Sequence, residues 1–479
     1  MVDYSRKWWA LTAVGSGTLL STIDGSIVNI SLNTLVAAFD SNLNVVEWVV
    51  LSYLLTITCM LLLMGRLGDM FGKRRVYVAG FVIFTLASAL CGISPNIGTL
   101  IGFRVVQAVG AAMIQSTGSA LLVTAFPPSE RGTALGASGS FVALGILLGP
   151  ALGGVLLRYV GWESIFYVNV PVGILGIWLS LRYLASDAKS AHGQIFDVGG
   201  ALLLMASIFG LLLALTEGPN WGWGDSRVLM LVGLFALAGA GFIAWELRFP
   251  QPMINLRIFR NAAFSLNLLA GFIMFIGMAF NLLLTPLFFQ LVYKYELQQA
   301  GLLLMALPLT LSLTSPISGR LSDRVGARVL TIGGLICVAI GLGGLSMTSA
   351  DTPVIQMIIF LLVVGAGIGL FQSPNNSTVF GSAPPEVLGV AGGLLAVMRN
   401  LGQTAGIAIA GAVWTSQVIA LNGGPIEPIT AASPAILAGG FDMAMRVAAM
   451  LTILAILPSL AGGRATSRRR AVSVRPTAD

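Results

Sequence analysis

The sequence predicts an all-α polytopic membrane protein with 14 transmembrane helices. Hydrophobic residues make up 56% of the 479 residues and charged residues only 9%, whereas charged residues form about a quarter of a soluble domain. The apolar residues occur in runs of about 20, which is the length of a helix that crosses a bilayer. Short charged or Pro/Gly-rich segments separate these runs. A soluble globular fold is therefore excluded.

The expected spans follow one another along the whole chain with short connections. The run at 389–419 is the longest, so its limits are the hardest to place. In order, the spans lie near residues 9–32, 45–66, 76–94, 97–124, 134–157, 164–184, 196–216, 228–247, 263–288, 297–318, 329–349, 353–376, 389–419 and 438–460.

The distribution of basic residues predicts the orientation of these spans. The gaps after even-numbered spans, counted with the span ends that border them, and both tails hold 20 of the 26 Lys and Arg residues; the other gaps hold three, and three lie within spans. Cytoplasmic segments carry the excess of basic residues in multi-pass proteins. We therefore expect both termini in the cytoplasm and residues 217–227 outside. The net charge of +7 fits an anionic membrane face better than nucleic acid.

Cysteine and histidine are too few and too scattered for several kinds of site. Cys59, Cys91 and Cys337 lie inside apolar runs without a CxxC pair, which argues against structural disulfides and zinc sites. His192 is the only histidine and lies in a polar segment. The first residues lead into a long span without a small-residue cleavage site, so we expect no removed signal peptide.

One charged segment occurs twice. GRLGDMFGKRR at 65–75 returns as GRLSDRVGAR at 319–328, 254 positions later. The copies follow the second and the tenth span, which indicates two six-helix bundles of repeated design. We expect an N-terminal bundle at 1–185, an inserted helix pair at 186–250, a C-terminal bundle at 251–462 and a basic cytoplasmic tail at 463–479.

Five segments carry a resemblance to a known family. GRLGDMFGKRR resembles the loop motif of the major facilitator superfamily, RVVQAVGAA its fourth-span motif, and GILLGPALGG the fifth-span motif of its antiporters. The other two segments are similar to segments typical of its 14-span drug:proton antiporters of the QacA/EmrB type. The last two of the following are the most specific. They are RVVQAVGAA at 104–112, GILLGPALGG at 145–154, STIDGSIVNISL at 21–32 and GWESIFYVNVPVG at 161–173.

The resemblance implies the major facilitator fold and a proton-coupled secondary antiporter. Such a protein exports amphiphilic, often cationic drugs by alternating access, works as a monomer in the cell membrane and meets protons and lipids besides its substrates. It needs no cofactor, because the proton gradient supplies the energy. An exporter or flippase of a lipid or an endogenous metabolite is the alternative.

A channel, sensor or enzyme is a third class, and the sequence argues against it. It contains no nucleophile constellation and no repeated filter-like segment. GDMFGKRR has three residues between its glycines and no Ser or Thr after the lysine, so it is not a phosphate-binding loop.

Asp24 is the expected proton-coupling residue. A carboxylate in the middle of a span costs roughly 2.5–3.5 kcal/mol or more, so it normally faces a cavity and has a function. Ser21 shares its helical face, and Arg104 is its expected partner, with Gln107 and Gln115 on the same side of the fourth span. A structural role for Asp24 or Arg104 is the alternative. Ser21, Gln107 and Gln115, with Arg399 and Gln403 in the second half, are expected to line the substrate pathway.

One set of glycines is expected to act in helix packing. Gly145, Gly149 and Gly153, with Pro150, form a ridge on the fifth span that lets another helix approach. In the family this antiporter helix resembles part of the seam between the bundles; ordinary helix packing is the alternative.

The repeated segment is expected to be a cytoplasmic gating loop. Asp69 would face the positive N-terminal end of the span near Gly389, and Glu130 would pair with Arg74. The remaining residues expected in the gate are Gly65, Gly72, Lys73, Gly319, Asp323 and Gly326.

Overall fold

The computed structural model describes residues 4–186, 195–424, 426 and 428–462. The basic tail at 463–479 and His192 lie outside the described residues. Within them every element of regular secondary structure is helical, and 14 helices are long and apolar enough to cross a membrane. The predicted fold class and number of spans are thereby confirmed.

The chain forms two compact units. The first comprises residues 1–214, 224–255 and 384–397, and the second comprises 215–223, 256–383 and 398–479. The short α2, α7 and α12 belong to the same spans as the helices that follow them. The helices are α1 (Lys7–Ala38), α2 (Leu43–Val46), α3 (Trp48–Phe71), α4 (Lys73–Gly92), α5 (Ile97–Ala125), α6 (Arg131–Tyr159), α7 (Ser164–Tyr167), α8 (Asn169–Tyr183), α9 (Val198–Trp221), α10 (Ser226–Glu246), α11 (Ala262–Leu291), α12 (Leu297–Leu304), α13 (Ala306–Val325), α14 (Ala327–Leu345), α15 (Val354–Ser382), α16 (Leu388–Asn422) and α17 (Pro434–Leu454).

Several helices extend further than the apolar runs. The first has 32 residues, about 48 Å at a rise of 1.5 Å per residue, which exceeds the ~30 Å hydrocarbon core. α9 continues to Trp221 and thus includes Glu217, which was expected in a connection. Backbone hydrogen bonds continue a helix past the membrane surface, whereas hydropathy marks only the part within the hydrocarbon.

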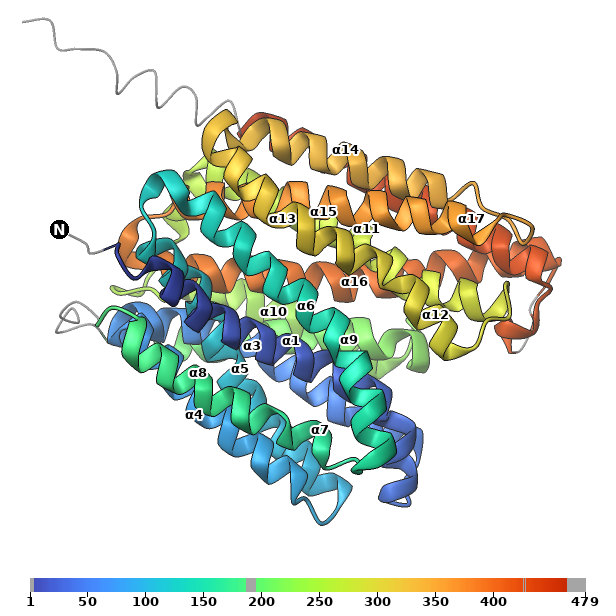
Figure 1. Ribbon diagram of the computed structural model, residues 1–479, viewed down its shortest axis with the longest axis horizontal. Coiled ribbons are helices and arrows are strands. Elements are labelled where there is room, and N and C mark those ends of the chain that lie inside the picture. Colours follow the sequence, from blue (N-terminus) through green and yellow to red (C-terminus); the bar gives the residue numbers. More distant parts are fainter. Residues whose placement is uncertain (1–3, 187–194, 425, 427, 463–479) are drawn as a thin grey trace, which may run out of the picture. The chain divides into compact units, whose positions relative to one another are not determined.

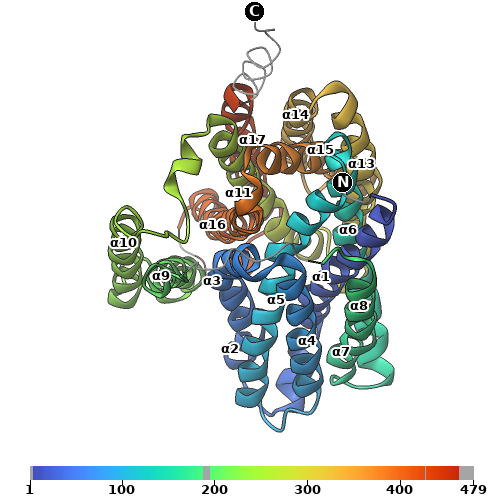
Figure 2. The same cartoon turned by 90° about the vertical axis from the view of Figure 1, so that its left-hand side faces the viewer.

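The two six-helix bundles predicted from the sequence repeat show the same pattern of helix packing. In the first bundle α5 packs against α3 and α4, and α8 packs against α1 and α4. In the second bundle α15 packs against α13 and α14 in the same way, and α17 packs against α11 and α14. Figures 1 and 2 show these helices side by side within each bundle. Each six-helix bundle therefore has its own interior.

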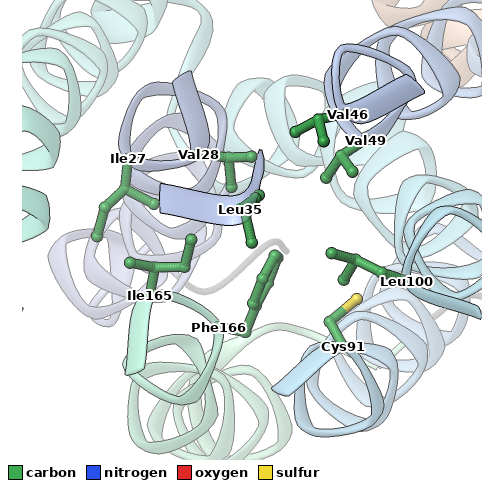
Figure 3. Packing of buried hydrophobic residues seen from close by; sticks show 9 residues of the cluster. All are labelled: Ile27, Val28, Leu35, Val46, Val49, Cys91, Leu100, Ile165 and Phe166. Atoms are coloured by element: carbon green, nitrogen blue, oxygen red, sulfur yellow. The ribbon is translucent and has the colours of Figure 1, made fainter. Parts of the chain in front are cut away.

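A dry cluster fills one end of the first bundle. Ile27, Val28 and Leu35 of α1 meet Leu100 of α5 and Phe166 of α7, all fully buried (Figure 3). Ile27 and Val28 follow Asp24 within little more than one helical turn, so this packing borders the polar centre described below. In a membrane such contacts act through close van der Waals packing.

Candidate functional site

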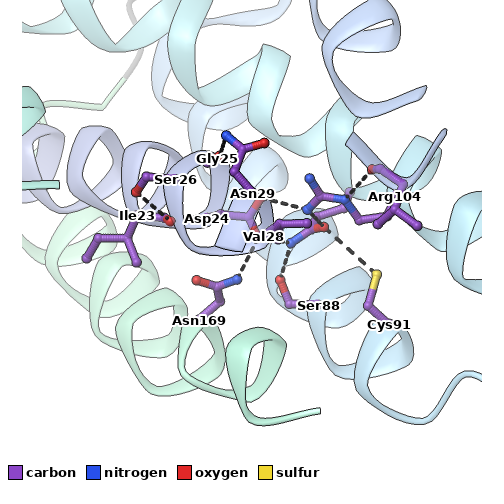
Figure 4. A network of polar contacts seen from close by, with 12 residues as sticks. Ile23, Asp24, Gly25, Ser26, Val28, Asn29, Ser88, Cys91, Arg104 and Asn169 are labelled. Carbon is purple, nitrogen blue, oxygen red and sulfur yellow. Dashed lines mark hydrogen bonds and ion pairs between the residues drawn. The ribbon is translucent and has the colours of Figure 1, made fainter. Parts of the chain in front are cut away.

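Asp24 lies on α1 in the interior of the first bundle and is 0% exposed. Its Oδ2 accepts a hydrogen bond from Arg104 Nη1 of α5 at 2.7 Å. Its Oδ1 accepts from Gln107 Nε2 at 2.9 Å and from Asn169 Nδ2 of α8 at 2.8 Å. Figure 4 shows Arg104 of α5 and Asn169 of α8 reaching the carboxylate of Asp24 on α1. Both oxygens are satisfied, which is the condition for keeping a charge in such a place.

Arg104 is held from more than one side. It is 1% exposed, and its Nε donates to the carbonyl oxygen of Val49 at 3.1 Å. Nη1 also donates to Gln107 Oε1 at 2.7 Å, and the guanidinium lies 3.9 Å from the ring centroid of Tyr53. A planar guanidinium over an aromatic face gains a cation–π contact. The positive charge is thus fixed by α3 as well as by Asp24.

A further set of polar contacts orients Gln107. Its Nε2 donates to Ser88 Oγ of α4 at 2.6 Å, and Cys91 Sγ donates weakly to its Oε1 at 3.9 Å. Gln107 therefore touches both members of the ion pair while α4 fixes its orientation. A fully connected buried network of this kind has one preferred arrangement.

Protonation of this carboxylate would change the arrangement. A neutral carboxyl loses the Coulomb attraction to Arg104 and offers one acceptor fewer. Arg104 would then remain buried next to a neutral group, which costs free energy. The network therefore depends on the charge of Asp24.

The structure brings together some of the expected pathway residues and not others. Asp24, Arg104 and Gln107 are in direct contact. Ser21 instead donates to the carbonyl oxygen of Thr18 on its own helix at 3.1 Å. Gln115 is half-buried two turns further along α5. Sequence reasoning therefore identified the centre but not its extent along α1.

Three members of the centre were missed. Asn169, Ser88 and Tyr53 lie on α8, α4 and α3, and each is nearly fully buried. Asn169 lies in the quoted segment GWESIFYVNVPVG as a lone amide among apolar residues, and that is the signal which would have found it. Nothing in their spacing marks Ser88 and Tyr53.

Arg399 and Gln403 lie on the part of α16 that belongs to the second unit. Both are half-buried. Arg399 Nε reaches Asn400 Oδ1 at 3.5 Å. Their expected role in a substrate pathway stays a prediction.

The segment 65–75 is not a loop, contrary to expectation. α3 continues through Phe71 and α4 begins at Lys73, so only Gly72 separates the two helices. Gly72 has a φ of +108°, a left-handed conformation that L side chains rarely adopt. In the second copy α13 likewise runs past Gly319 and Asp323 to Val325, and Gly326 has a φ of +91°. The motif marks a sharp break between two helices.

Asp69 occupies the place expected for it. Its Oδ1 accepts from the backbone N–H of Gly389 at 2.8 Å and its Oδ2 from that of Val390 at 2.9 Å, at the start of α16. Lys73 Nζ lies 2.8 Å from Oδ1 of the same carboxylate. All four residues belong to the first unit. The negative charge thus meets the positive end of a helix and two of its unpaired N–H groups.

Gly65 allows α3 to approach α16, and Gly68 allows it to approach α5. A Cβ added at Gly65 would overlap the carbonyl oxygen of Gly389, and one at Gly68 would lie 2.6 Å from the methyl group of Thr117. Only Gly72 serves the turn, whereas the other two glycines serve close packing.

The expected pair of Glu130 and Arg74 is replaced by other contacts. Glu130 forms an ion pair with Lys7 at the start of α1. Arg74 donates to the backbone carbonyl of Leu181 near the end of α8. Since α4 packs on α8 in this bundle, the Arg74 side chain reaches a neighbouring helix end.

The glycine ridge of α6 faces α1 of its own bundle. Added Cβ atoms at Gly145, Gly149 and Gly153 would collide with Thr22, Ser26 and Ile27 respectively. Ser26 Oγ also donates to the carbonyl oxygen of Gly145 at 3.3 Å. These contacts fit the alternative of ordinary helix packing inside the first unit, and the expected place of this face in a seam between bundles stays a prediction. Pro150 lies on the exposed side of the same helix.

In the part of the chain that the structure describes, no group of three or more His, Cys, Asp or Glu side chains is placed to hold a metal ion.

Comparison with known proteins gives a consistent set of similarities. Residues 14–407 match the family model described as Major Facilitator Superfamily. A riboflavin transporter, RibZ, of Clostridioides difficile is 36% identical over 84% of this chain and 87% of its own length. Multidrug resistance protein Stp of Mycobacterium tuberculosis (strain CDC 1551 / Oshkosh) is 32% identical over 85% of this chain and 76% of its own.

Another relative and a solved structure are also transport proteins by name. The tetracenomycin C resistance and export protein of Streptomyces glaucescens is 31% identical over 86% of this chain and 77% of its own. Among solved structures, the proton:xylose symporter XylE bound to 6-bromo-6-deoxy-D-glucose superposes with a TM-score of 0.66 at 15% identity, covering 95% of both chains. At that identity the superposition concerns the fold alone.

Proposed function

This chain belongs to the major facilitator superfamily, and on that premise we propose that it is a proton-coupled antiporter exporting amphiphilic, often cationic compounds. The membership makes it a multi-pass membrane transporter and not an enzyme. Two parts of the proposal go beyond membership, namely the proton as the driving ion and toxic compounds as the cargo.

The observation that carries the first part is the buried ion pair of Asp24 and Arg104, with a 2.7 Å contact between them and exposures of 0% and 1%. A buried carboxylate that forms part of a satisfied network has two states of different charge and different packing. One proton moving inward gains about 2.3 kcal/mol per 100 mV of membrane potential. Taking up that proton at Asp24 would release Arg104 and favour the alternative arrangement of the helices.

The names of the relatives support the second part. A multidrug resistance protein and an antibiotic resistance and export protein are each similar over more than four-fifths of this chain. Amphiphilic cargo also fits the many apolar side chains of the bundles, which leave few charges to recognise a small hydrophilic solute. The protein would act as a monomer in the cell membrane with both termini in the cytoplasm.

The riboflavin transporter among the relatives favours a second candidate, the transport of an endogenous metabolite. Riboflavin is an aromatic amphiphile, so its recognition would place similar demands on a pocket. A lipid would require a path open to the bilayer along the bundle.

Proton release on binding separates these candidates. The purified protein in weakly buffered detergent solution would be mixed with lipophilic cations, with riboflavin and with a phospholipid, while a pH dye is followed. At a pH low enough to protonate Asp24, we expect lipophilic cations to release up to one proton per protein and Asp24→Asn to abolish this release. Release by riboflavin or phospholipid alone would replace the drug-export proposal by the corresponding candidate.

A further inference from the structure

Two other carboxyl groups are buried at one end of the inserted helix pair. Asp197 immediately precedes α9 and Glu246 is the last residue of α10, and these helices run side by side (Figure 2). Asp197 is 2% exposed and Glu246 is 5% exposed. Neither belongs to the Asp24 centre or to the contact between Asp69 and α16.

Each of these carboxyl groups is half satisfied. Asp197 Oδ1 accepts from the N–H of Gly200 at 2.8 Å and from Trp245 Nε1 at 2.9 Å. Glu246 Oε1 accepts from the N–H of Ile254 at 3.3 Å, and the N–H of Met253 also acts on this carboxyl group. The other oxygens, Asp197 Oδ2 and Glu246 Oε2, are buried and meet no hydrogen-bond partner among the residues that the structure describes.

The two carboxyl groups approach the same point. A Cβ added at Gly200 would overlap Asp197 Oδ2 and would lie 3.2 Å from Glu246 Oε1. The charged groups that act on Glu246 are Asp197 itself and Arg66 of α3. Two full negative charges this close, each with a buried oxygen lacking a donor, repel each other and lose hydration without compensation.

We propose that Asp197 and Glu246 together bind one proton. One carboxyl group carries the proton on its otherwise unpartnered oxygen and donates it to the carboxylate of the other, so the O–H···O⁻ bond supplies the missing donor. The pair then carries one negative charge in place of two, and that charge faces Arg66. This is a second proton site, on helices that lie outside the two six-helix bundles.

The site also has a mechanical connection. Arg66 lies three residues before Asp69 on α3, and Glu246 holds the backbone of Ile254 in the segment that follows α10. Binding or loss of the shared proton changes the charge facing Arg66 by one unit. A change in pH therefore alters the charge of the inserted pair, and this change acts on the end of α3 that contacts α16.

Infrared difference spectroscopy of the purified protein tests the proposal. The stretching band of a protonated carboxyl would be recorded at neutral pH in Asp24→Asn protein, which removes the other proton site. We expect one such band, and we expect it to disappear when either Glu246→Gln or Asp197→Asn is added. In each variant the new amide donates an N–H to the remaining carboxylate, so that group no longer needs a proton.

Glu217→Gln is the matched control, since Glu217 is also buried on α9 but accepts from Asn220 Nδ2 at 3.3 Å. It is expected to leave the band unchanged. The proposal is overturned if Asp24→Asn protein has no protonated-carboxyl band, or if the band survives both single amide changes. Loss of the band in the control alone also overturns it. If Asp24→Asn protein cannot be purified, the same differences are taken between wild type and each amide variant.

Discussion

At the scale of single residues, substitutions of Asp24 and Arg104 are expected to differ in their effect on stability. Arg104→Ala leaves the carboxylate buried with two amide donors and no counter-charge, a change that costs roughly 3–5 kcal/mol for buried pairs. Asp24→Asn keeps an oxygen that accepts from Arg104, and Arg104 retains Val49 and Gln107 as acceptors. Both variants lose the ion pair, but Arg104→Ala also loses the hydrogen bonds and the packing of the guanidinium, so we expect a larger drop in the melting temperature for Arg104→Ala than for Asp24→Asn.

Thermal unfolding in detergent measures both changes. Arg227→Ala is the control, because Arg227 pairs with Asp225 at the surface with 56% of its side chain exposed, and no measurable change is expected. Equal destabilisation by Arg104→Ala and Arg227→Ala would contradict the buried-pair account.

The residues of this centre show how far a sequence can be interpreted. Asp24 and Arg104 stand out because a charge within an apolar run is expensive wherever it points. Ser88 and Tyr53 do not stand out, because a hydroxyl within a membrane helix usually bonds to its own backbone. Their roles follow only from which helices pack together.

At the scale of helices, the glycines of α6 have different surroundings along one element. Gly149→Ala would force a methyl group into Ser26 of α1, whereas the neighbouring Gly154 has nothing within 4 Å of an added Cβ. Overpacking costs typically about 1–3 kcal/mol, and Gly→Ala in an open helical position gains about 0.5–1 kcal/mol in water-soluble helices. Gly149→Ala should lower the melting temperature and Gly154→Ala should not; the reverse order would refute the packing of this ridge on α1.

The contact of Asp69 with α16 belongs to the same scale. Loss of such a helix-capping carboxylate costs about 0.5–2 kcal/mol, and here it weakens one conformation more than the substrate pocket. Asp69→Ala is expected to reduce transport while substrate affinity changes by less than a few-fold. Asp69→Asn keeps an acceptor for one N–H, so its transport rate should lie between those of wild type and Asp69→Ala.

Transport by reconstituted protein and equilibrium binding measure the two quantities separately. A collapse of affinity in Asp69→Ala, without a change in the balance of inward-open and outward-open forms, would rule out a gating role.

The repeat of this motif was found from the sequence, but its secondary structure was not predicted correctly. Charges and glycines between apolar runs are typical of a loop, so 65–75 was expected to be one. The helix continues because Arg66 and Asp69 keep their helical hydrogen bonds while their side chains reach partners beyond the apolar core. Only Gly72 departs from helical geometry, and a single residue is below what hydropathy resolves.

At the scale of the whole molecule, the charge asymmetry predicts an orientation that labelling can test. A cysteine at Gly224, in the connection between α9 and α10, has open space around it and should react with a membrane-impermeant thiol reagent added outside the cell. A cysteine at Arg470 should react only after the membrane is opened. The native Cys59 and Cys91 are buried, and the half-buried Cys337 is replaced by serine so that the background stays low. Labelling of residue 470 from outside would invert the orientation.

The number of spans and the two-bundle repeat followed from the sequence because each depends on hydropathy and periodicity along the chain. The partners of Glu130 and the face used by the α6 glycines did not, since both depend on which helices become neighbours. The substrate is harder still to predict from the sequence, because amphiphilic compounds are recognised by the shape of a pocket that no short motif encodes.

The most direct test of the account is gradient-driven transport by Asp24→Asn in proteoliposomes. An imposed pH gradient should drive uptake of a lipophilic cation by wild-type protein and none by Asp24→Asn. The variant should still exchange labelled for unlabelled substrate without a gradient, since that exchange needs no change in protonation. Full gradient-driven transport by Asp24→Asn would contradict the account and leave Asp24 as a structural residue of the bundle.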